Sequence, residues 1–280
     1  MQPKQTLSAT AISGQTFDYI VCGGGTSGCV IAAGLASIPD VSVLLIEAGR
    51  DSGLAPDVLV PGKYVKQLQD KDEGSRLEGV REAVNYMALA RGPAADYDEW
   101  VKMVGDDGWK WENIFPLMKQ LKDFDPKLPA YLERFAALRA EDHGVFGPLK
   151  IGHSIVPRYQ FGKPSGRWLA QFNVRNGERS YAANAFLGES ARASRKNLII
   201  VTNTECDRVH FRDGVVTGVE LYDRLTGALF HVYCREQTVL CAGTFGSPRI
   251  LLLSGLGPKD TLERLNIPVQ VDLLAKKELL

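Results

Sequence analysis

Three features are absent from this sequence, and each absence excludes a class of protein. There is no excess charge, since Lys plus Arg and Asp plus Glu each number 33, so no net field attracts nucleic acid or an anionic membrane surface. No apolar run approaches the about 20 residues that span a bilayer, and residues 1–16 lack the apolar core of a secretory signal. The sequence therefore predicts an intracellular, cytoplasmic protein that binds neither nucleic acid nor membrane.

Cysteines and histidines are few and scattered. The five cysteines form no CxxC pair, and three lie in apolar runs, so reduced, buried thiols are favoured over disulfides or metal ligands. The four histidines form no HxH or HxxxH pair, so neither a metal site nor zinc chemistry is predicted. These residues are Cys22, Cys29, Cys206, Cys234 and Cys241, and His143, His153, His210 and His231.

The amino-terminal part of the chain has the pattern of a strand, a helix and a second strand. FDYIVC at 17–22 is rich in β-forming residues, 27–38 has helical apolar spacing, and VSVLLI at 41–46 is typical of a buried parallel strand. The composition, 45% hydrophobic and 24% charged, is that of a globular protein. A βαβ unit is therefore predicted over residues 17–50.

A glycine-rich turn follows the first predicted strand and fits GxGxxG with Gly23, Gly25 and Gly28. These glycines permit a tight turn, close approach of a pyrophosphate to backbone N–H groups, and close packing of helix on strand, respectively. Glu47 ends the second strand, 19 residues after Gly28, where an acid accepts hydrogen bonds from ribose hydroxyls and repels a 2′-phosphate. Such a loop alone is also typical of an ordinary turn, but its context predicts a dinucleotide site, for FAD or NAD.

Beyond residue 50 the patterns predict a surface connection, packing helices and a β-rich region. Asp213-Gly214 and Thr226-Gly227 are turns that join strands into a meander, which suits an FAD-binding domain better than a simple NAD fold. The predicted helices are residues 81–90, 109–121, 181–187, 247–254 and 260–265. The predicted strands are residues 198–202, 206–211, 215–222, 229–234 and 237–241, with another after the turn in GVFGPLKI at 144–151.

Several words of the sequence resemble the glucose–methanol–choline family of FAD-dependent oxidoreductases. They are FDYIVCGGGTSGCVIAAGLA, VLLIEAG, NYMA, DYDEW, CAG and GSPRILLLSGLGP, in the family's order, and residues 243–257 fit its second signature. The resemblance implies an α/β fold: a Rossmann-like FAD-binding domain, with a parallel sheet, helices and a β-meander, and only a remnant of the substrate domain. It also implies FAD as the cofactor.

The resemblance assigns cofactor contacts to particular residues. It implies that Thr26 and Ser27 lie beside the pyrophosphate, that Glu47 and Ala48 lie at the adenosine ribose, and that the backbone of Cys206 meets adenine. A helix cap for Asn85 and a simple core position for Cys206 stay open as alternatives. The residues implied along the flavin side are Asn85, Tyr86, Met87 and Ala88.

The sequence also departs from the family. The small residues of its first signature align with 79–82, where Val80, Arg81 and Glu82 are larger. At 271–276 the family's glycine and Asn-Leu-x-Asp-His are replaced, and the part that carries the proton-removing histidine pair is missing. No histidine of this chain is carried over to that role, so the catalytic residues are unassigned.

The sequence thus predicts a shortened, FAD-dependent oxidoreductase, a dehydrogenase or oxidase that passes hydride from a small-molecule alcohol, of the aryl-alcohol or secondary-metabolite kind, to flavin. A non-catalytic remnant or nucleotide-binding module and an NAD-dependent enzyme are the alternatives. Apolar runs at 250–256 and 273–280 predict an exposed surface for self-association or a partner chain. The expected domains are a flexible amino terminus at 1–16, an FAD-binding domain at 17–122 and 178–280, and a remnant of the substrate or cap region at 123–177.

Overall fold

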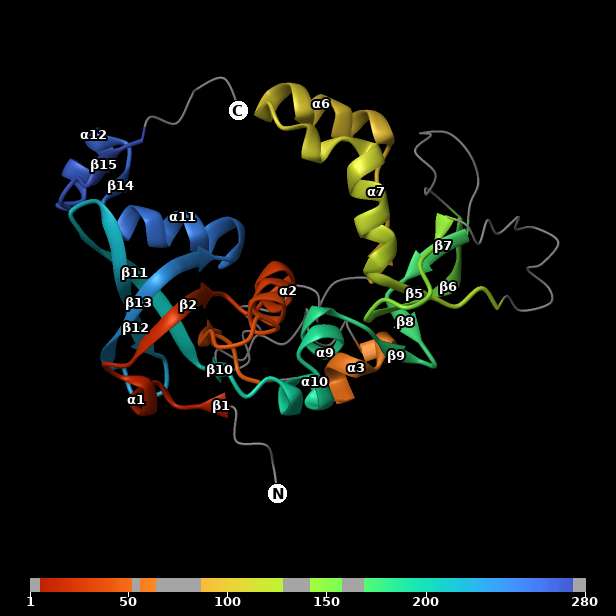
Figure 1. The fold of residues 1–280 in the computed structure, drawn as a ribbon, viewed down its shortest axis with the longest axis horizontal. Coiled ribbons are helices and arrows are strands. Elements are labelled where there is room, and N and C mark those ends of the chain that lie inside the picture. The colour runs from red at the N-terminus through yellow and green to blue at the C-terminus, as the bar shows by residue number, and fades with distance from the viewer. Residues whose placement is uncertain (1–5, 52–55, 64–86, 128–141, 158–168, 274–280) are drawn as a thin grey trace. The chain divides into compact units, whose positions relative to one another are not determined.

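A computed structural model describes residues 6–51, 56–63, 87–127, 142–157 and 169–273 (Figure 1). These residues form two compact units. The first unit contains residues 6–51 and 186–273, and the second contains the other described residues up to 185.

A seven-stranded sheet forms the centre of the first unit. The central strand β2 (Thr16–Cys22) has β3 (Val43–Ile46) on one side and β13 (Leu229–Leu240) on the other, all parallel. The chain passes from β2 through a helix to β3, whereas β13 lies on the opposite side. The carboxyl ends of β2 and β13 therefore form a switch point, where open α/β sheets bind ligands. The outer strands are β10 (Leu198–Val201) and β1 (Thr6–Leu7) beyond β3, and β12 (Val215–Asp223) and β11 (Thr204–Arg212) beyond β13.

The core of the first unit is formed by apolar strands and small helical residues. All four residues of β3 are buried, as expected for a parallel strand covered on both faces. Helix α2 (Thr26–Leu35) buries Cys29, Ala32 and Ala33, whose small side chains allow close approach to the sheet. Helix α11 (Gly243–Leu253) packs against β11 (Figure 1). The remaining elements of the unit are α1 (Ala9–Ile12), α10 (Glu189–Ser194), β14 (Leu256–Gly257), α12 (Lys259–Arg264) and β15 (Val271–Asp272).

The predicted βαβ unit is confirmed as β2, α2 and β3, and the predicted helices at 247–254 and 260–265 as α11 and α12. The amino-terminal segment adds β1 and α1, whose Ala9 and Ile12 lie in the hydrophobic core. The prediction of an exposed apolar surface at 250–256 is wrong. Ile250, Ser254 and Gly255 are buried and the other residues of this run are only partly exposed, because α11 packs against β11. In the second predicted run Leu273 is exposed, and residues 274–280 lie outside the described residues.

Two details of the predicted meander are also wrong. The strand predicted at 198–202 is β10, which pairs in parallel with β3 rather than joining the meander. The runs 229–234 and 237–241 form one strand, β13, with a bulge between Cys234 and Gln237. The first half of β13 pairs with β12 and the second half with β2, and this change of partner is a property of the sheet, which no local pattern encodes.

The second unit contains a small sheet and a helical hairpin. In the described residues, the sheet has the order β4-β7-β6-β5. Aromatic rings hold the hairpin together, since Trp111 packs against Tyr97 and Phe115 with ring centroids 5.3 and 5.0 Å apart. The strands of the second unit are β4 (Ala88–Leu89), β5 (Lys122–Phe124), β6 (Leu149–Pro157), β7 (Leu169–Phe172), β8 (Val174–Arg175) and β9 (Glu178–Arg179). Its helices are α3 (Pro56–Leu59), η1 (Pro61–Lys63), α6 (Ala94–Val104), η2 (Asp107–Trp109) and α7 (Trp111–Gln120), and α9 (Ala182–Phe186) leads out of the unit.

Most predictions for the second unit are confirmed. The helix predicted at 109–121 is α7, that at 181–187 is α9, and the strand after the turn in GVFGPLKI is β6. The helix predicted at 81–90 is wrong in its described part, because Ala88 and Leu89 form β4 and Met87 has a positive φ. No helix in the described ranges is both long and apolar enough to cross a membrane.

Candidate cofactor site

The glycine loop makes its turn directly at the end of β2. Gly23 has a φ of +109°, in the region that favours glycine, and an added Cβ would lie 2.3 Å from the carbonyl oxygen of Cys241. Cys241 follows β13, whose last residue pairs with Cys22. Glycine is therefore required at position 23 for two reasons: the positive φ of the predicted tight turn and the close contact with the residue after β13.

Gly28 lies in the first turn of α2 and faces the same loop. An added Cβ at Gly28 would lie 1.8 Å from the carbonyl oxygen of Gly23 and 3.2 Å from the Cβ of Cys241. Helix α2 thus packs against the loop at backbone distance. This contact supplies the physical reason for the close packing predicted at Gly28.

The amino terminus of α2 is free of competing side chains. Its cap, Gly25, is extended and has no side chain to accept the first N–H groups, and the first turn contains no acid. Thr26 and Ser27 are exposed. A helix terminus of this kind presents backbone N–H groups and the positive end of the helix dipole to an anion. The residues therefore fit a phosphate group.

Glu47 closes the site from the end of β3. Its side chain is buried, with Oε2 accepting a hydrogen bond from the N–H of Gly24 at 2.6 Å and Oε1 accepting one from the N–H of Gly49 at 2.8 Å. Burial raises the pKa of Glu47, while these hydrogen bonds oppose the shift. The carboxylate is thus held in place by the glycine loop itself. Ala48 follows it and is half-buried.

Gly24 is the residue of this loop that the sequence analysis missed. It stands at an unrestricted position of GxGxxG, so the motif assigns it no role. In the structure its N–H binds Glu47, and an added Cβ would lie 3.0 Å from Glu47 Oε2. The sequence signal for Gly24 was indirect: a run of three glycines next to a buried acid indicates that the acid and the backbone approach closely.

Cys206 lies near the end of β2, although it comes from β11. It is buried, and hydrogen bonding with Cys206, together with burial, raises the pKa of the Cys22 thiol well above its ordinary value. Cys22, Cys29 and Cys206 are buried thiols, and Cys234 and Cys241 are partly buried. The fold therefore brings Cys206 next to the strand that leads into the glycine loop.

Of the residues predicted along the flavin side, Met87 and Ala88 are described, and both belong to the second unit. Met87 is buried with a φ of +60°, and its carbonyl oxygen accepts a hydrogen bond from the N–H of Asn173 at 2.9 Å. Ala88 is exposed at the start of β4. Asn85 and Tyr86 lie outside the described residues, as does the altered signature at 79–82.

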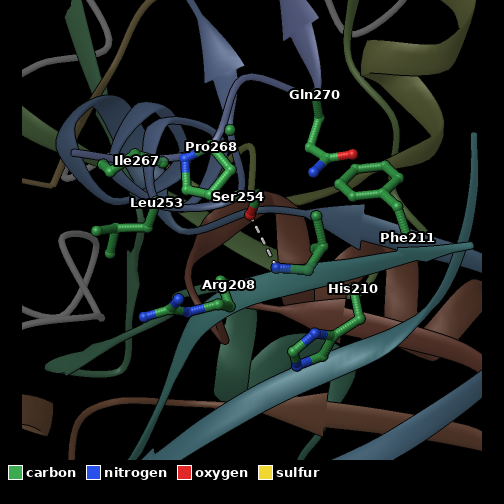
Figure 2. A pocket seen from close by; sticks show the side chains of 10 residues that line it. Arg208, His210, Phe211, Leu253, Ser254, Ile267, Pro268 and Gln270 are labelled. Carbon is green, nitrogen blue, oxygen red and sulfur yellow. Dashed lines mark hydrogen bonds between the residues drawn. The ribbon is translucent and has the colours of Figure 1, made fainter. Parts of the chain in front are cut away.

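A separate cavity of about 220 Å³ lies between β11 and the segment after α11. Figure 2 shows Phe211 and Gln270 on one side of β11 and the Ser254 hydroxyl bonded to the β11 backbone. Its lining is mixed: Leu253, Ile267 and Pro268 are apolar, whereas Arg208 and His210 are polar. None of the predicted cofactor residues lines it, so this cavity is distinct from the glycine loop.

Comparison with known proteins identifies the family of this chain. A family model described as GMC oxidoreductase matches residues 17–273. The chain belongs to the glucose–methanol–choline (GMC) oxidoreductase family. This confirms the resemblance and the α/β fold class predicted from the sequence, and FAD is the cofactor of this family, as predicted.

Individual GMC relatives agree with this assignment. Alcohol oxidase from Candida boidinii is 29% identical, over 92% of this chain and 44% of its own. Glucose dehydrogenase [FAD, quinone] from Drosophila melanogaster is 31% identical, over 90% and 45%. An FAD-dependent oxidoreductase from Chaetomium thermophilum matches with a TM-score of 0.81 and 26% identity, over 92% and 50%. The chain spans about half the length of these GMC proteins.

Proposed function

We propose that the first unit binds the adenosine diphosphate half of FAD at the carboxyl end of β2. In this proposal the N–H groups of Thr26 and Ser27 bind the pyrophosphate, Glu47 and Ala48 contact the ribose, and the backbone of Cys206 meets adenine. Asn85, Tyr86, Met87 and Ala88 are the proposed contacts with the flavin, as the family resemblance implies.

The contact between Glu47 and Gly24 is the observation that carries the proposal. It joins the acid at the end of β3 to the loop before α2, so a ribose acceptor and a phosphate-binding helix terminus are held in one structure. Each carboxylate oxygen of Glu47 accepts one hydrogen bond from the backbone. A carboxylate oxygen can accept more than one hydrogen bond. Acceptor capacity therefore remains for the ribose hydroxyls.

The proposed activity is that of a GMC-type oxidoreductase acting on a small-molecule alcohol. FAD bound to this chain would supply the hydride acceptor for oxidation of the alcohol carbon. The role of the first unit's residues is to hold and orient the adenosine diphosphate half of the cofactor through the loop and Glu47. An aryl-alcohol or secondary-metabolite substrate is the finer proposal. Support for an alcohol comes from the similarity to alcohol oxidase and to glucose dehydrogenase.

The test begins with the intact chain, purified by gel filtration and examined by visible absorption. Near-stoichiometric flavin on a monodisperse protein is expected, and bleaching of the flavin band by members of an anaerobic alcohol panel would establish turnover. Protein that stays colourless with added FAD would refute cofactor binding, and saturation with NAD in place of FAD would identify a different cofactor.

A pair of variants tests the role of Glu47. Glu47→Gln removes a charged acceptor, which is worth about 1.5–3 kcal/mol, so the Kd for FAD is expected to rise about 10- to 100-fold. Glu263→Gln on α12 is the matched control, because its side chain is 58% exposed and forms a surface ion pair with Lys259 at 3.8 Å, away from the glycine loop. Equal FAD affinity in folded Glu47→Gln and wild-type protein would contradict the proposed ribose contact.

The second candidate is an FAD-binding module without turnover. It is favoured by the positions of the described histidine rings. His143 is buried in the second unit, stacked on Phe124 with ring centroids 3.9 Å apart, and His210 and His231 lie on the β-meander. Bound flavin that no alcohol bleaches would establish this alternative, whereas alcohol-dependent bleaching would exclude it.

A further inference from the structure

Three side chains that can bind a metal ion meet on the β-meander, the antiparallel strands β11, β12 and β13. His210 lies on β11, Glu220 on β12 and His231 on β13, and their ligand atoms lie within 4.8 Å of one another. Glu220 and His231 are direct cross-strand partners. The residue opposite His210 on β12 is Gly218, so no side chain at that position separates the two imidazole rings.

The distances within the cluster suit a first-row divalent ion. His231 Nδ1 lies 3.2 Å from His210 Nε2, and His231 Nε2 lies 3.6 Å from Glu220 Oε2. Metal bonds of about 2.0–2.2 Å place neighbouring ligands of a tetrahedral ion about 3.3–3.6 Å apart. The side chain of His231 is 50% exposed, so its ring has room to turn one nitrogen toward both partners.

Arg208 orients the carboxylate of the cluster. Its Nε forms an ion pair with Glu220 Oε1 at 3.1 Å, while Glu220 Oε2 faces His231. Metal-ligating carboxylates commonly have an outer polar partner of this kind.

The cluster adjoins the 220 Å³ cavity, since His210 and Arg208 also line it, but it is separate from the glycine loop. In Figure 2 the His210 ring lies on the opposite side of β11 from Phe211 and Gln270. No predicted cofactor residue belongs to the cluster. Spacing rules along the chain did not find it, because the sheet register joins residues that lie 10 to 21 positions apart.

We propose that His210, Glu220 and His231 form a binding site for a first-row divalent cation, with Zn²⁺ as the probe, on the β-meander. Two histidines and one carboxylate supply three ligands and leave a fourth position for water. The bound ion links β11, β12 and β13, so it stabilises the folded first unit in proportion to its concentration over its Kd. This proposal is independent of FAD binding.

The experiment is a titration of the chelator-treated full chain with Zn²⁺ and Co²⁺. We expect calorimetry to show saturable Zn²⁺ binding, with no comparable response to Mg²⁺, which prefers oxygen ligands. In wild-type protein, the imidazole NMR signals of His210 and His231 are expected to shift on Zn²⁺ addition while that of His143 stays in place. Bound Co²⁺ should show tetrahedral visible bands without thiolate charge-transfer absorption.

Variants separate this cluster from other donors. His210→Gln, Glu220→Gln and His231→Gln are each expected to weaken Zn²⁺ binding by more than about tenfold, since loss of even an outer partner of a ligand has an effect of that size. Glu263→Gln is the charge-matched control and should bind as wild type. Unshifted histidine signals in saturated wild-type protein, thiolate bands with Co²⁺, or unchanged affinity in all three folded variants would overturn the proposal.

Discussion

Alanine at Gly28 and at Gly34 makes the same chemical change in the same helix, α2, with opposite expected results. At Gly28 an added Cβ would lie 1.8 Å from the Gly23 carbonyl oxygen, whereas at Gly34 no atom lies within 4 Å. Both substitutions reduce the conformational freedom of the unfolded chain. Only the first of them forces two backbone segments apart.

The magnitudes follow from these contacts. Alanine in place of glycine inside a helix contributes about 0.5–1 kcal/mol, and Gly34→Ala is expected to gain about this amount. At Gly28 the same gain is outweighed, because an ordinary contact of 3.4 Å requires the helix and the loop to separate by about 1.6 Å. Overpacking of this kind costs about 1–3 kcal/mol or more. We therefore expect a net loss of about 2 kcal/mol and weaker FAD binding for Gly28→Ala.

Hydrogen exchange followed by mass spectrometry reports on the first unit alone. Peptides that cover β2 and α2 should exchange faster in Gly28→Ala and slower in Gly34→Ala, and urea denaturation followed by circular dichroism gives the sign independently. FAD titration of Gly34→Ala should match wild type. If both variants shift stability in the same direction by similar amounts, packing of α2 on the loop does not limit this site.

Three further substitutions test other parts of the molecule. Hydrogen bonds from the N–H and hydroxyl of Ser42 lower the pKa of Asp18 to about 2. The ionised Asp18 therefore stabilises the folded protein by about 1–2 kcal/mol above the unfolded pKa of about 3.9, and this stabilisation is lost as the pH falls toward 2. Urea denaturation across this range should show wild type losing its advantage over Asp18→Asn, and a constant difference would contradict this. Burial lowers the pKa of Lys122 to about 7, so the stability of the wild type should rise with pH from 7 toward the unfolded pKa of about 10.4. Lys122→Met should be more stable than the wild type at neutral pH and should lack this rise. An identical pH profile of the two proteins would refute this prediction. Ser254→Ala removes the oxygen that accepts from the buried N–H of Val209 at 2.9 Å, so a loss of about 1–3 kcal/mol and faster exchange of that amide are expected, and wild-type exchange would count against this role.

The βαβ unit could be predicted because its signals are local. The apolar run of β3, the glycines before α2 and the helical spacing after them each lie within a few residues of the element that they specify. The same holds for α7 and α11, although their exact ends moved by a few residues. The helix predicted at 81–90 failed in its described part because pairing of Ala88 with Phe172 on β7 overrides a weak helical pattern.

The candidate site divides in the same way. Gly23, Gly28 and Glu47 could be assigned from spacing, because a strand, a turn and a helix in sequence place them at one edge of a parallel sheet. The hydrogen bond between Gly24 and Glu47 joins residues 23 positions apart, and no motif rule describes it. The sequence therefore indicated which residues belong to the loop but not how the loop holds the acid.

Local patterns in this chain determine the strands, the helices and the glycine turn, because backbone propensity and apolar periodicity act over a few residues. Tertiary structure decides which strands become neighbours. In this sheet β10 pairs with β3, β13 lies between β12 and β2, and the meander brings His210, Glu220 and His231 together. The physical reason is that strand pairing depends on the burial of whole faces and on closing long loops, energies that belong to the assembled sheet and not to any one segment.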